Sequence, residues 1–216
     1  MKILLGLILC LIFQGIFSES SFSLVDSNVR EFLENRENQW PELYLPNFKL
    51  SDTSKDLIYP KWFEGNWLVT SQDIINDSEE PVIYKVNFFK NDSDLIVGNR
   101  AKNSESINNQ ITYLKDDFYI DSRITGRNQI QDDDIFFADE LVIQTAHKPG
   151  ASRINQVETI SKFQKCSEEI LEVHNSIKPS ICGVQYVASY GSKVGDTSVH
   201  AIKTNKYKLT FEFIEN

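Results

Sequence analysis

The chain has 216 residues, of which 41% are hydrophobic, 12% aromatic and 25% charged. This length suits one domain with a sizeable core, and the composition excludes an intrinsically disordered chain. The formal net charge of −9 argues against a nucleic-acid partner, because phosphate backbones bind basic surfaces.

Residues 1–20 are typical of a secretory signal peptide. Lys2 supplies a positive charge, Ile3–Phe17 is largely apolar, and Ser18-Glu19-Ser20 offers the small residues that a signal peptidase needs. The apolar run is shorter than the ~20 residues of a membrane-spanning helix. We therefore predict cleavage and export without a permanent transmembrane helix. An uncleaved membrane anchor is the alternative.

Export would leave Cys166 and Cys182 in a compartment that can be oxidising. If they pair, the disulfide closes a loop of about 17 residues and stabilises the protein by roughly 3 kcal/mol in the chain-entropy model. The alternative is two separately buried thiols. Spacing alone does not show that the two Cα atoms come within the ~7 Å that a bridge requires.

Residues 25–40 have the periodicity of an amphipathic helix. Five side chains recur at intervals of three and four: Val25, Val29, Phe32, Leu33 and Arg36. Trp40-Pro41 ends this helix, since the residue before a proline avoids helical angles. Three prolines and no clean period over residues 41–60 then predict an extended arm packed over the domain. We assign residues 21–60 to this helix and arm.

After Pro60 the hydrophobic period changes to two, which is the period of β-strands. Turn signals such as Asn91-Asp92-Ser93 and Gly195-Asp196 separate the alternating runs. The runs are Trp67–Val69, Val82–Phe88, Leu95–Val97, Phe118–Ile124, Ile135–Thr145, Val157–Phe163, Val184–Tyr190 and Tyr207–Phe213. Eight to ten strands without intervening helices predict a mainly β fold, a single antiparallel barrel or a strongly curved sandwich over residues 61–216.

Motifs of catalysis and metal binding are missing from the sequence. It has no phosphate-binding glycine loop, zinc-type His/Glu pair or Gly-x-Ser-x-Gly elbow. Asp132-Asp133-Asp134 fits a solvated turn better than a calcium loop, because it lacks spaced ligands and a turn glycine. We therefore predict no catalytic residues, no metal and no cofactor, and we favour a protein that is not an enzyme.

Gly65-Asn66-Trp67 opens the first predicted strand, just after Trp62-Phe63. In a small barrel, a glycine here lets the chain bend, and the tryptophan closes the floor with an indole N–H to satisfy. Lys206 or Lys208, from the last strand, is placed to lie over that indole. The pattern resembles the lipocalin/calycin superfamily and implies a calycin-like barrel, with Gly65, Trp62 and Lys208 in structural roles. The superfamily's Thr-Asp-Tyr turn and late-strand arginine are missing here.

Six segments together suggest a second resemblance. They are Trp40-Pro41 with Leu45-Pro46, Asp56–Trp67, Asn99–Asn103, Thr125-Gly126-Arg127, Asn155–Thr159 and Tyr207–Thr210. In this order they resemble an uncharacterised family of exported proteins from cyanobacteria and chloroplasts, defined by a domain of unknown function. The resemblance implies a β-barrel-like protein of the thylakoid lumen or the periplasm, and it brings no catalytic residues. Asn99 and Lys102 depart from the family's preferred Asp and Phe, and we do not associate the cysteine pair with the family.

Charged residues in or beside predicted strands are candidates for a ligand site. They are Arg100, Arg123, Arg127 and Glu158. An inward charge must be paired or desolvated at a cost, and an inward Arg–Glu pair can bind a ligand carboxylate or phosphate. The alternative is a structural ion pair or side chains that face solvent. Our predicted ligand site consists of Trp67, Arg100, Arg123 and Glu158.

Two functions fit these observations. The first is binding of a small apolar or amphipathic molecule, such as a lipid or a pigment, inside the barrel. The second is a non-catalytic assembly role on a lumenal membrane-protein complex, with the N-terminal helix, Trp40–Phe48 or Trp62-Phe63 as the docking surface. A barrel filled by its own side chains favours docking. A barrel that is open around Arg100 or Arg123 favours binding.

Overall fold

The computed structural model describes residues 27–48, 56–76, 80–100, 102–103, 119–148, 151–166, 180–191 and 199–214. The predicted signal peptide, Val25 and Phe118 lie outside these residues. Within the described ranges, no helix is both long enough and apolar enough to span a membrane.

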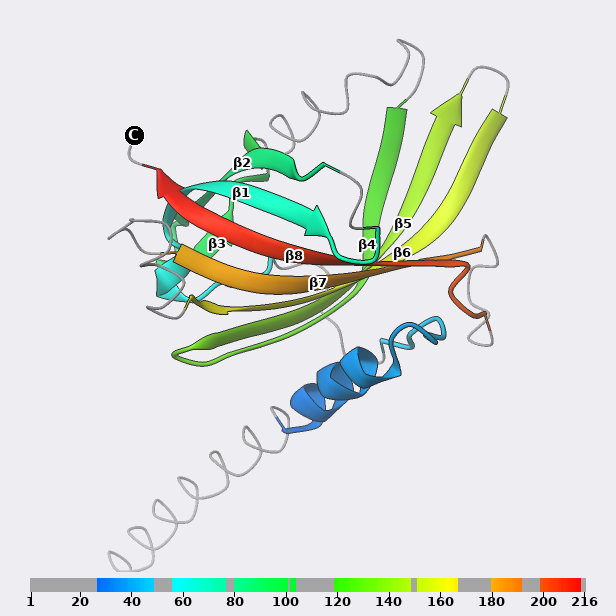
Figure 1. Cartoon of the computed structure of the whole chain (residues 1–216), viewed down its shortest axis with the longest axis horizontal. Coiled ribbons are helices and arrows are strands. Elements are labelled where there is room, and N and C mark those ends of the chain that lie inside the picture. The colour runs from blue at the N-terminus through cyan, green and yellow to red at the C-terminus, as the bar shows by residue number, and fades with distance from the viewer. Residues whose placement is uncertain are drawn as a thin grey trace, which may run out of the picture.

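In the described part of the chain, eight antiparallel strands form one strongly curled sheet (Figure 1). They are β1 (Gly65–Asp73), β2 (Val82–Lys90), β3 (Ile96–Gly98), β4 (Tyr119–Gln131), β5 (Ile135–Lys148), β6 (Ala151–Lys165), β7 (Ser180–Tyr190) and β8 (Lys203–Ile214). Their order in the sheet is β3-β2-β1-β8-β7-β6-β5-β4, so every neighbouring pair except β1–β8 is consecutive in the chain. The predicted mainly β, strongly curved antiparallel fold is confirmed as a half-barrel whose free edges are β3 and β4.

Side chains alternate between a concave and a convex face of the sheet, and each face carries its own apolar cluster. The concave cluster is rich in aromatic rings and includes Phe63, Trp67, Val69, Phe88, Phe136, Phe163, Leu209 and Phe211. The convex cluster includes Leu33, Leu43, Phe137, Leu141, Ile160, Tyr186, Ala188 and Tyr190. The two successive residues Phe136 and Phe137 are therefore both buried, one on each face.

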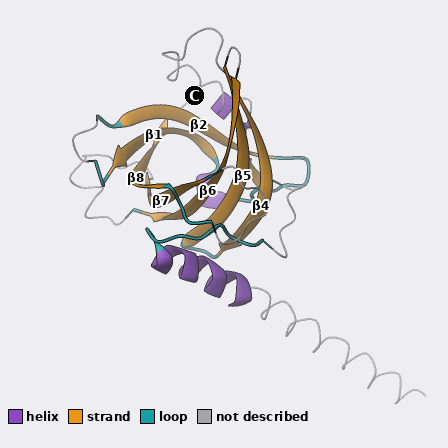
Figure 2. Ribbon diagram, turned by 90° about the vertical axis from the view of Figure 1, so that its right-hand side faces the viewer, coloured by secondary structure: helices purple, strands orange, loops and turns teal. Residues whose placement is uncertain are grey.

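The N-terminal helix, residues 27–39, lies outside the curl and covers part of the convex face (Figure 2). Leu33 and Arg36 are its buried residues, as the spacing of the amphipathic pattern predicts. Tyr186 belongs to this convex layer, with its ring centroid 5.6 Å from that of Trp40. Tyr186 therefore faces the helix and not the interior of the curl, because the helix gives the outer face a core of its own.

A β-bulge in β4 decides which side chains face inward. The register with β5 runs from Ile124 opposite Val142 to Gly126 opposite Leu141, with one residue inserted. Ile124 faces the concave side, and regular alternation would place Gly126 there next. The inserted residue instead turns Arg127 inward. Gly126 has no space for a Cβ atom, because Phe48 packs directly on it.

Residues 56–60 run across the opening between the two free edges of the sheet. Tyr59 N donates to Ile96 O of β3 at 2.9 Å, and Gln129 of β4 bonds the neighbouring peptide groups on the other side. The chain then turns through η1 (Lys61–Phe63), whose Phe63 is fully buried in the concave cluster. The arm thus fills the gap that β3 and β4 leave open.

Cys166 and Cys182 form a disulfide, with their Cα atoms 5.0 Å apart. The bond joins the end of β6 to the start of β7, where Cys166 N also donates to Ser180 O at 3.1 Å. Of the two alternatives that the sequence left open, the structure shows the bridge.

Candidate functional site

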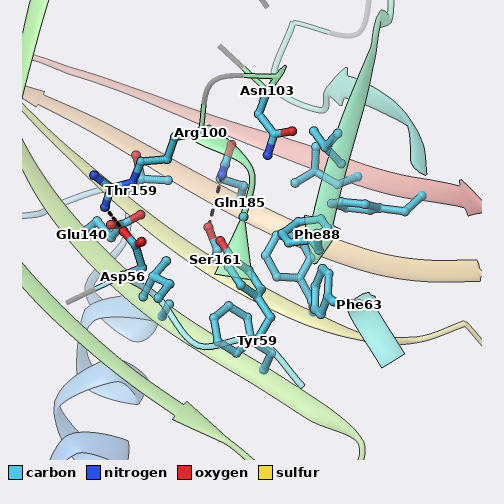
Figure 3. Close-up of a pocket in the computed structure, with 18 of the residues that line it drawn as sticks. Asp56, Tyr59, Phe63, Phe88, Arg100, Asn103, Glu140, Thr159, Ser161 and Gln185 are labelled. Carbon is cyan, nitrogen blue, oxygen red and sulfur yellow. Dashed lines mark hydrogen bonds and ion pairs between the residues drawn. The ribbon is translucent and has the colours of Figure 1, made fainter. Parts of the chain in front are cut away.

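A cavity of about 370 Å³ lies on the concave face of the sheet (Figure 3). Side chains from β2, β4, β5, β6, β7 and β8 line it, together with residues from the 56–63 segment and the stretch after β3. Its volume falls within the ~300–1,000 Å³ of small-molecule pockets. The side chains of the described residues therefore fill only part of the interior of this half-barrel.

Aromatic rings form one side of the cavity, and Phe63 is at their centre. The Phe63 ring contacts five other rings that line the cavity: Tyr59, Phe88, Phe136, Phe163 and Phe211. Several of these pairs are edge-to-face, for example Phe63 and Phe211 with centroids 5.9 Å apart and planes at 89°. Trp67 holds this floor from behind, because its Nε1 donates to Phe63 O at 2.7 Å.

Polar groups form the opposite side of the cavity, as Figure 3 shows. Gln185 Nε2 donates to Ser161 Oγ at 3.2 Å. Arg127 and Glu140 are directly opposed in the β4–β5 register, and Glu140 Oε1 accepts from Arg127 Nε at 2.7 Å and from Nη2 at 2.6 Å. Arg127 is 7% exposed and the Glu140 side chain is 25% exposed, so water reaches this ion pair mainly at its carboxylate.

Asp56 and Arg100 form a second ion pair at the rim of the cavity. Both side chains are substantially exposed, at 42% and 64%. Each of the two cavity arginines thus has a carboxylate partner, and the formal charges of the four side chains cancel.

Two tyrosines of the cavity wall are held in the uncharged form. Burial raises the pKa of the Tyr59 phenol well above its usual range, and the negative charge of Glu140 raises it further. Burial also raises the pKa of Tyr84. Both phenols are therefore neutral groups that can donate and accept hydrogen bonds.

The structure does not bring the four predicted ligand-site residues together. Of Trp67, Arg100, Arg123 and Glu158, only Arg100 lines the cavity. Trp67 is buried behind the aromatic floor, and Arg123 is exposed on β4, where it lies opposite Ile143. Glu158 is fully buried, but on the convex face, beneath the N-terminal helix.

Glu158 is the centre of a separate buried network. Arg36 donates to Glu158 Oε1 from Nε at 2.7 Å and to Oε2 from Nη2 at 2.6 Å. The hydroxyl of Tyr190 also donates to Glu158 Oε2, and Arg36 Nη2 reaches Tyr44 O at 2.8 Å. This network fixes the helix and the arm to the sheet, which is the structural role that the sequence left as the alternative for Glu158.

The predicted structural residues occupy different environments. Gly65 has a φ of +129°, and Trp62 stacks on Phe63 with ring centroids 4.6 Å apart. The expected cation over Trp67 was a wrong prediction, because Lys206 extends along the convex face to lie over Trp40 and Tyr186, 5.7 and 4.9 Å from their centroids. Lys208 is exposed on β8.

Sequence reasoning missed Glu140, Ser161 and Gln185 as cavity residues. A signal for Glu140 was present, because alternation places it on the same face as Phe136 and Ala138. Ser161 shares a face with Phe163 in the same way. Arg127 was one of the candidate strand charges but not part of the predicted ligand site, since the bulge that turns it inward has no clear sequence signal.

A further polar cluster lies at the far end of β4–β6, outside the cavity. Ser152 Oγ is 3.2 Å from His147 Nδ1, and His147 Nε2 is 3.0 Å from Asp121 Oδ2. The sequence does not show this arrangement, because strand pairing creates it. The Asp121 side chain is 73% exposed, so water screens its charge and orients the histidine weakly.

Comparison of the chain with protein-family models, curated proteins and solved structures gives no match. Function must therefore be argued from the site itself. The concave cavity is the candidate site, because it combines apolar surface with a few convergent polar groups.

Proposed function

We propose that this protein binds a small amphipathic molecule, such as a lipid or a pigment, in the concave cavity of its half-barrel. The observation that carries the proposal is the division of a cavity of about 370 Å³ into an aromatic side and a polar side. Ligand sites typically pair a mostly apolar lining with a few polar groups that fix orientation.

The size of the cavity suits a ligand larger than a single ring. An engineered apolar cavity of ~150 Å³ takes benzene, and this cavity has more than twice that volume. The apolar body of the ligand would rest against Phe63, Phe88 and Phe211. Its polar end would then face Ser161 and Glu140 on the opposite wall.

An exported location is part of the proposal. The Cys166–Cys182 disulfide is typical of oxidising compartments. The predicted signal peptide and the resemblance to exported cyanobacterial and chloroplast proteins point the same way. We accordingly place the protein in the thylakoid lumen or the periplasm.

Native mass spectrometry of the mature protein, purified under mild conditions from its own host, tests the proposal. An absorbance scan and an organic extract accompany it. We expect a stoichiometric extra mass that is absent from a Ser161→Phe variant, whose ring fills the cavity. A Ser122→Phe variant is the matched control, because Ser122 is exposed and does not line the cavity. A bare polypeptide mass for the wild-type protein would reject the proposal.

The second candidate is a non-catalytic assembly factor that docks on a membrane complex through its outer surface. Within the docking surfaces that we predicted, Phe63 and Leu43 are buried in the two cores, whereas Tyr44 is 46% exposed. A different surface supports this candidate. Four exposed aliphatic residues gather at the β1–β2 hairpin: Ile74, Ile75, Val82 and Ile83.

Co-purification from host membranes with the Ile75→Asp variant tests this second candidate. Docking through the hairpin predicts that a membrane-complex subunit accompanies the wild-type protein and is lost from the variant. Equal recovery with both proteins would exclude the hairpin as the docking surface. Thr70→Asp, on β1 and only partly exposed, controls for added charge.

A further inference from the structure

We propose that the cavity selects uncharged amphiphiles and discriminates against carboxylates and phosphates. This inference rests on the proposed binding function and specifies its ligand class. It reverses the expectation that an inward arginine recruits an anion. The reason is that each arginine of the cavity already has a carboxylate partner within the protein.

The Arg127–Glu140 pair, which is buried at its arginine, contributes most to this selectivity. Both Nε and Nη2 of Arg127 donate to the same Glu140 oxygen, at 2.7 and 2.6 Å. An anionic ligand near Arg127 would also lie near the Glu140 carboxylate, which repels it. It would lose its hydration in the same step, and that loss is costly for an ion. Binding of a cationic ligand is disfavoured for the corresponding reason, because Arg127 repels it.

The Asp56–Arg100 pair at the rim of the cavity does not attract a charged ligand either. Arg100 is 64% exposed and Asp56 is 42% exposed, so water and salt screen both charges. Their opposite signs also leave the pair without a net charge. A charged ligand therefore gains little from the rim before it meets the buried pair.

The remaining polar wall is built for an uncharged group. Gln185 Nε2 donates to Ser161 Oγ, and a hydroxyl that accepts one bond keeps its own proton to donate. Ser161 is 9% exposed and shares the cavity wall with Phe163. A ligand hydroxyl, carbonyl or amide oxygen can accept from Ser161 without bringing a charge into the cavity.

A series of probes with the same ring system and different charges tests the proposal. Naphthylethanol, naphthylacetate and naphthylethylammonium are titrated into the full mature chain by calorimetry, at low and at high salt. We expect naphthylethanol to bind at least ~10-fold more tightly than either ion, with an affinity that does not change with salt. Equal or tighter binding of naphthylacetate would overturn the selectivity but leave the binding function intact. If none of the three binds, both proposals fail.

A Glu140→Gln variant tests the cause of the selectivity. It removes the carboxylate that neutralises Arg127, so the affinity for naphthylacetate should rise at least ~10-fold, while that for naphthylethanol changes only slightly. Glu212→Gln on β8 makes the same substitution at an exposed site outside the cavity and should change neither affinity. An unchanged preference in a folded Glu140→Gln protein would overturn the assigned role of the ion pair.

A second variant keeps the test decisive if Glu140→Gln does not fold, since removing one partner of a buried pair destabilises proteins. Arg127→Met combined with Glu140→Leu removes both charges and roughly conserves volume. This protein should still bind naphthylethanol and reject naphthylacetate. A double variant that prefers naphthylacetate would overturn the proposal.

Discussion

Gln129 bonds both main-chain groups of Ile58 with its side-chain amide. Ile58 N donates to Gln129 Oε1 at 2.9 Å, and Gln129 Nε2 donates to Ile58 O at 3.0 Å. These are the two bonds that the backbone of a neighbouring strand would make. On its other side the segment pairs with β3 through Tyr59 and Ile96. One glutamine thus joins the free edge of β4 to the segment that spans the opening of the half-barrel.

Replacing Gln129 should weaken the attachment of residues 56–60 to the edge of β4. Gln129→Leu leaves the Ile58 N–H and C=O without their partners, which should cost about 1–3 kcal/mol of unfolding free energy. Urea denaturation measures the loss, and hydrogen exchange at the Ile58 amide locates it. Gln131→Leu, two residues along the same strand and exposed, is the control. Equal stabilities of the two variants would show that the Gln129–Ile58 hydrogen bonds contribute nothing to the free energy of unfolding.

Gly65 should tolerate no side chain. Its φ of +129° is unfavourable for other residues, and an added Cβ would lie 2.5 Å from Phe213 Cε2. We expect Gly65→Ala to cost at least ~1–3 kcal/mol in thermal or chemical denaturation. Gly98→Ala is the matched control, because its nearest neighbour would be an ordinary 3.6 Å away. Adding Phe213→Leu to Gly65→Ala should recover the part of the loss due to the clash, and the part due to φ should remain.

Stability should depend on pH through Asp139. This residue is fully buried, and neither of its carboxyl oxygens accepts a hydrogen bond from a donor among the described residues. Burial, and then the charge of Glu158, raises the pKa of Asp139 well above its ordinary value. The folded protein therefore keeps a proton that the unfolded chain releases near pH ~4. The unfolding free energy should fall as pH rises from there through the folded pKa.

The Asp139→Asn variant isolates this effect, because asparagine resembles the protonated acid and does not titrate. Its stability relative to the wild-type protein should rise with pH by up to ~1.4 kcal/mol per unit within that window and then level off. Urea unfolding at a series of pH values measures the difference. Asp133→Asn, an exposed substitution nearby, should show no comparable trend. A stability difference that stays constant with pH would disprove the buried proton.

The attachment of the helix depends on the Arg36–Glu158 pair. Arg36→Met leaves the buried Glu158 carboxylate without its cationic partner. The substitution should lower the free energy of unfolding by about 3–5 kcal/mol. Combining it with Glu158→Leu should restore much of the loss, because both charges are then removed from the buried site. A double-mutant cycle by denaturation gives the coupling energy. Simple additivity of the two single losses would contradict a direct interaction.

The disulfide should stabilise the protein in the absence of reductant. Changing both Cys166 and Cys182 to serine should lower the unfolding free energy by about 3 kcal/mol, the value expected for a loop of this length. The wild-type protein treated with reductant should approach the stability of the variant. If reductant left the wild-type stability unchanged, the bond would contribute nothing measurable.

Local patterns in the amino-acid sequence determine much of this protein. The period of two over residues 61–216 specifies an antiparallel β fold, because side chains of a strand alternate between faces. Likewise, the spacing of Leu33 and Arg36 specifies a helix with one buried side, and Pro41 specifies its end. Gly65 and Trp67 mark the start of the first strand for reasons of backbone freedom and buried area. Each of these features depends on residues close together in the chain.

Only the tertiary structure determines which side chains of a strand point into the concave cavity and which point to the convex face. Glu158 is buried as we expected of a strand charge, yet it faces the helix, because β6 is covered on both sides. Arg127 reached the cavity through a bulge, and its partner Glu140 came from the opposing strand. The closure by Gln129, the Lys206–Trp40 contact and the cavity itself all join residues far apart in the sequence. Periodicity gives the spacing of side chains along one strand, but contacts across strands depend on register and curvature, which are fixed only when the whole sheet has folded.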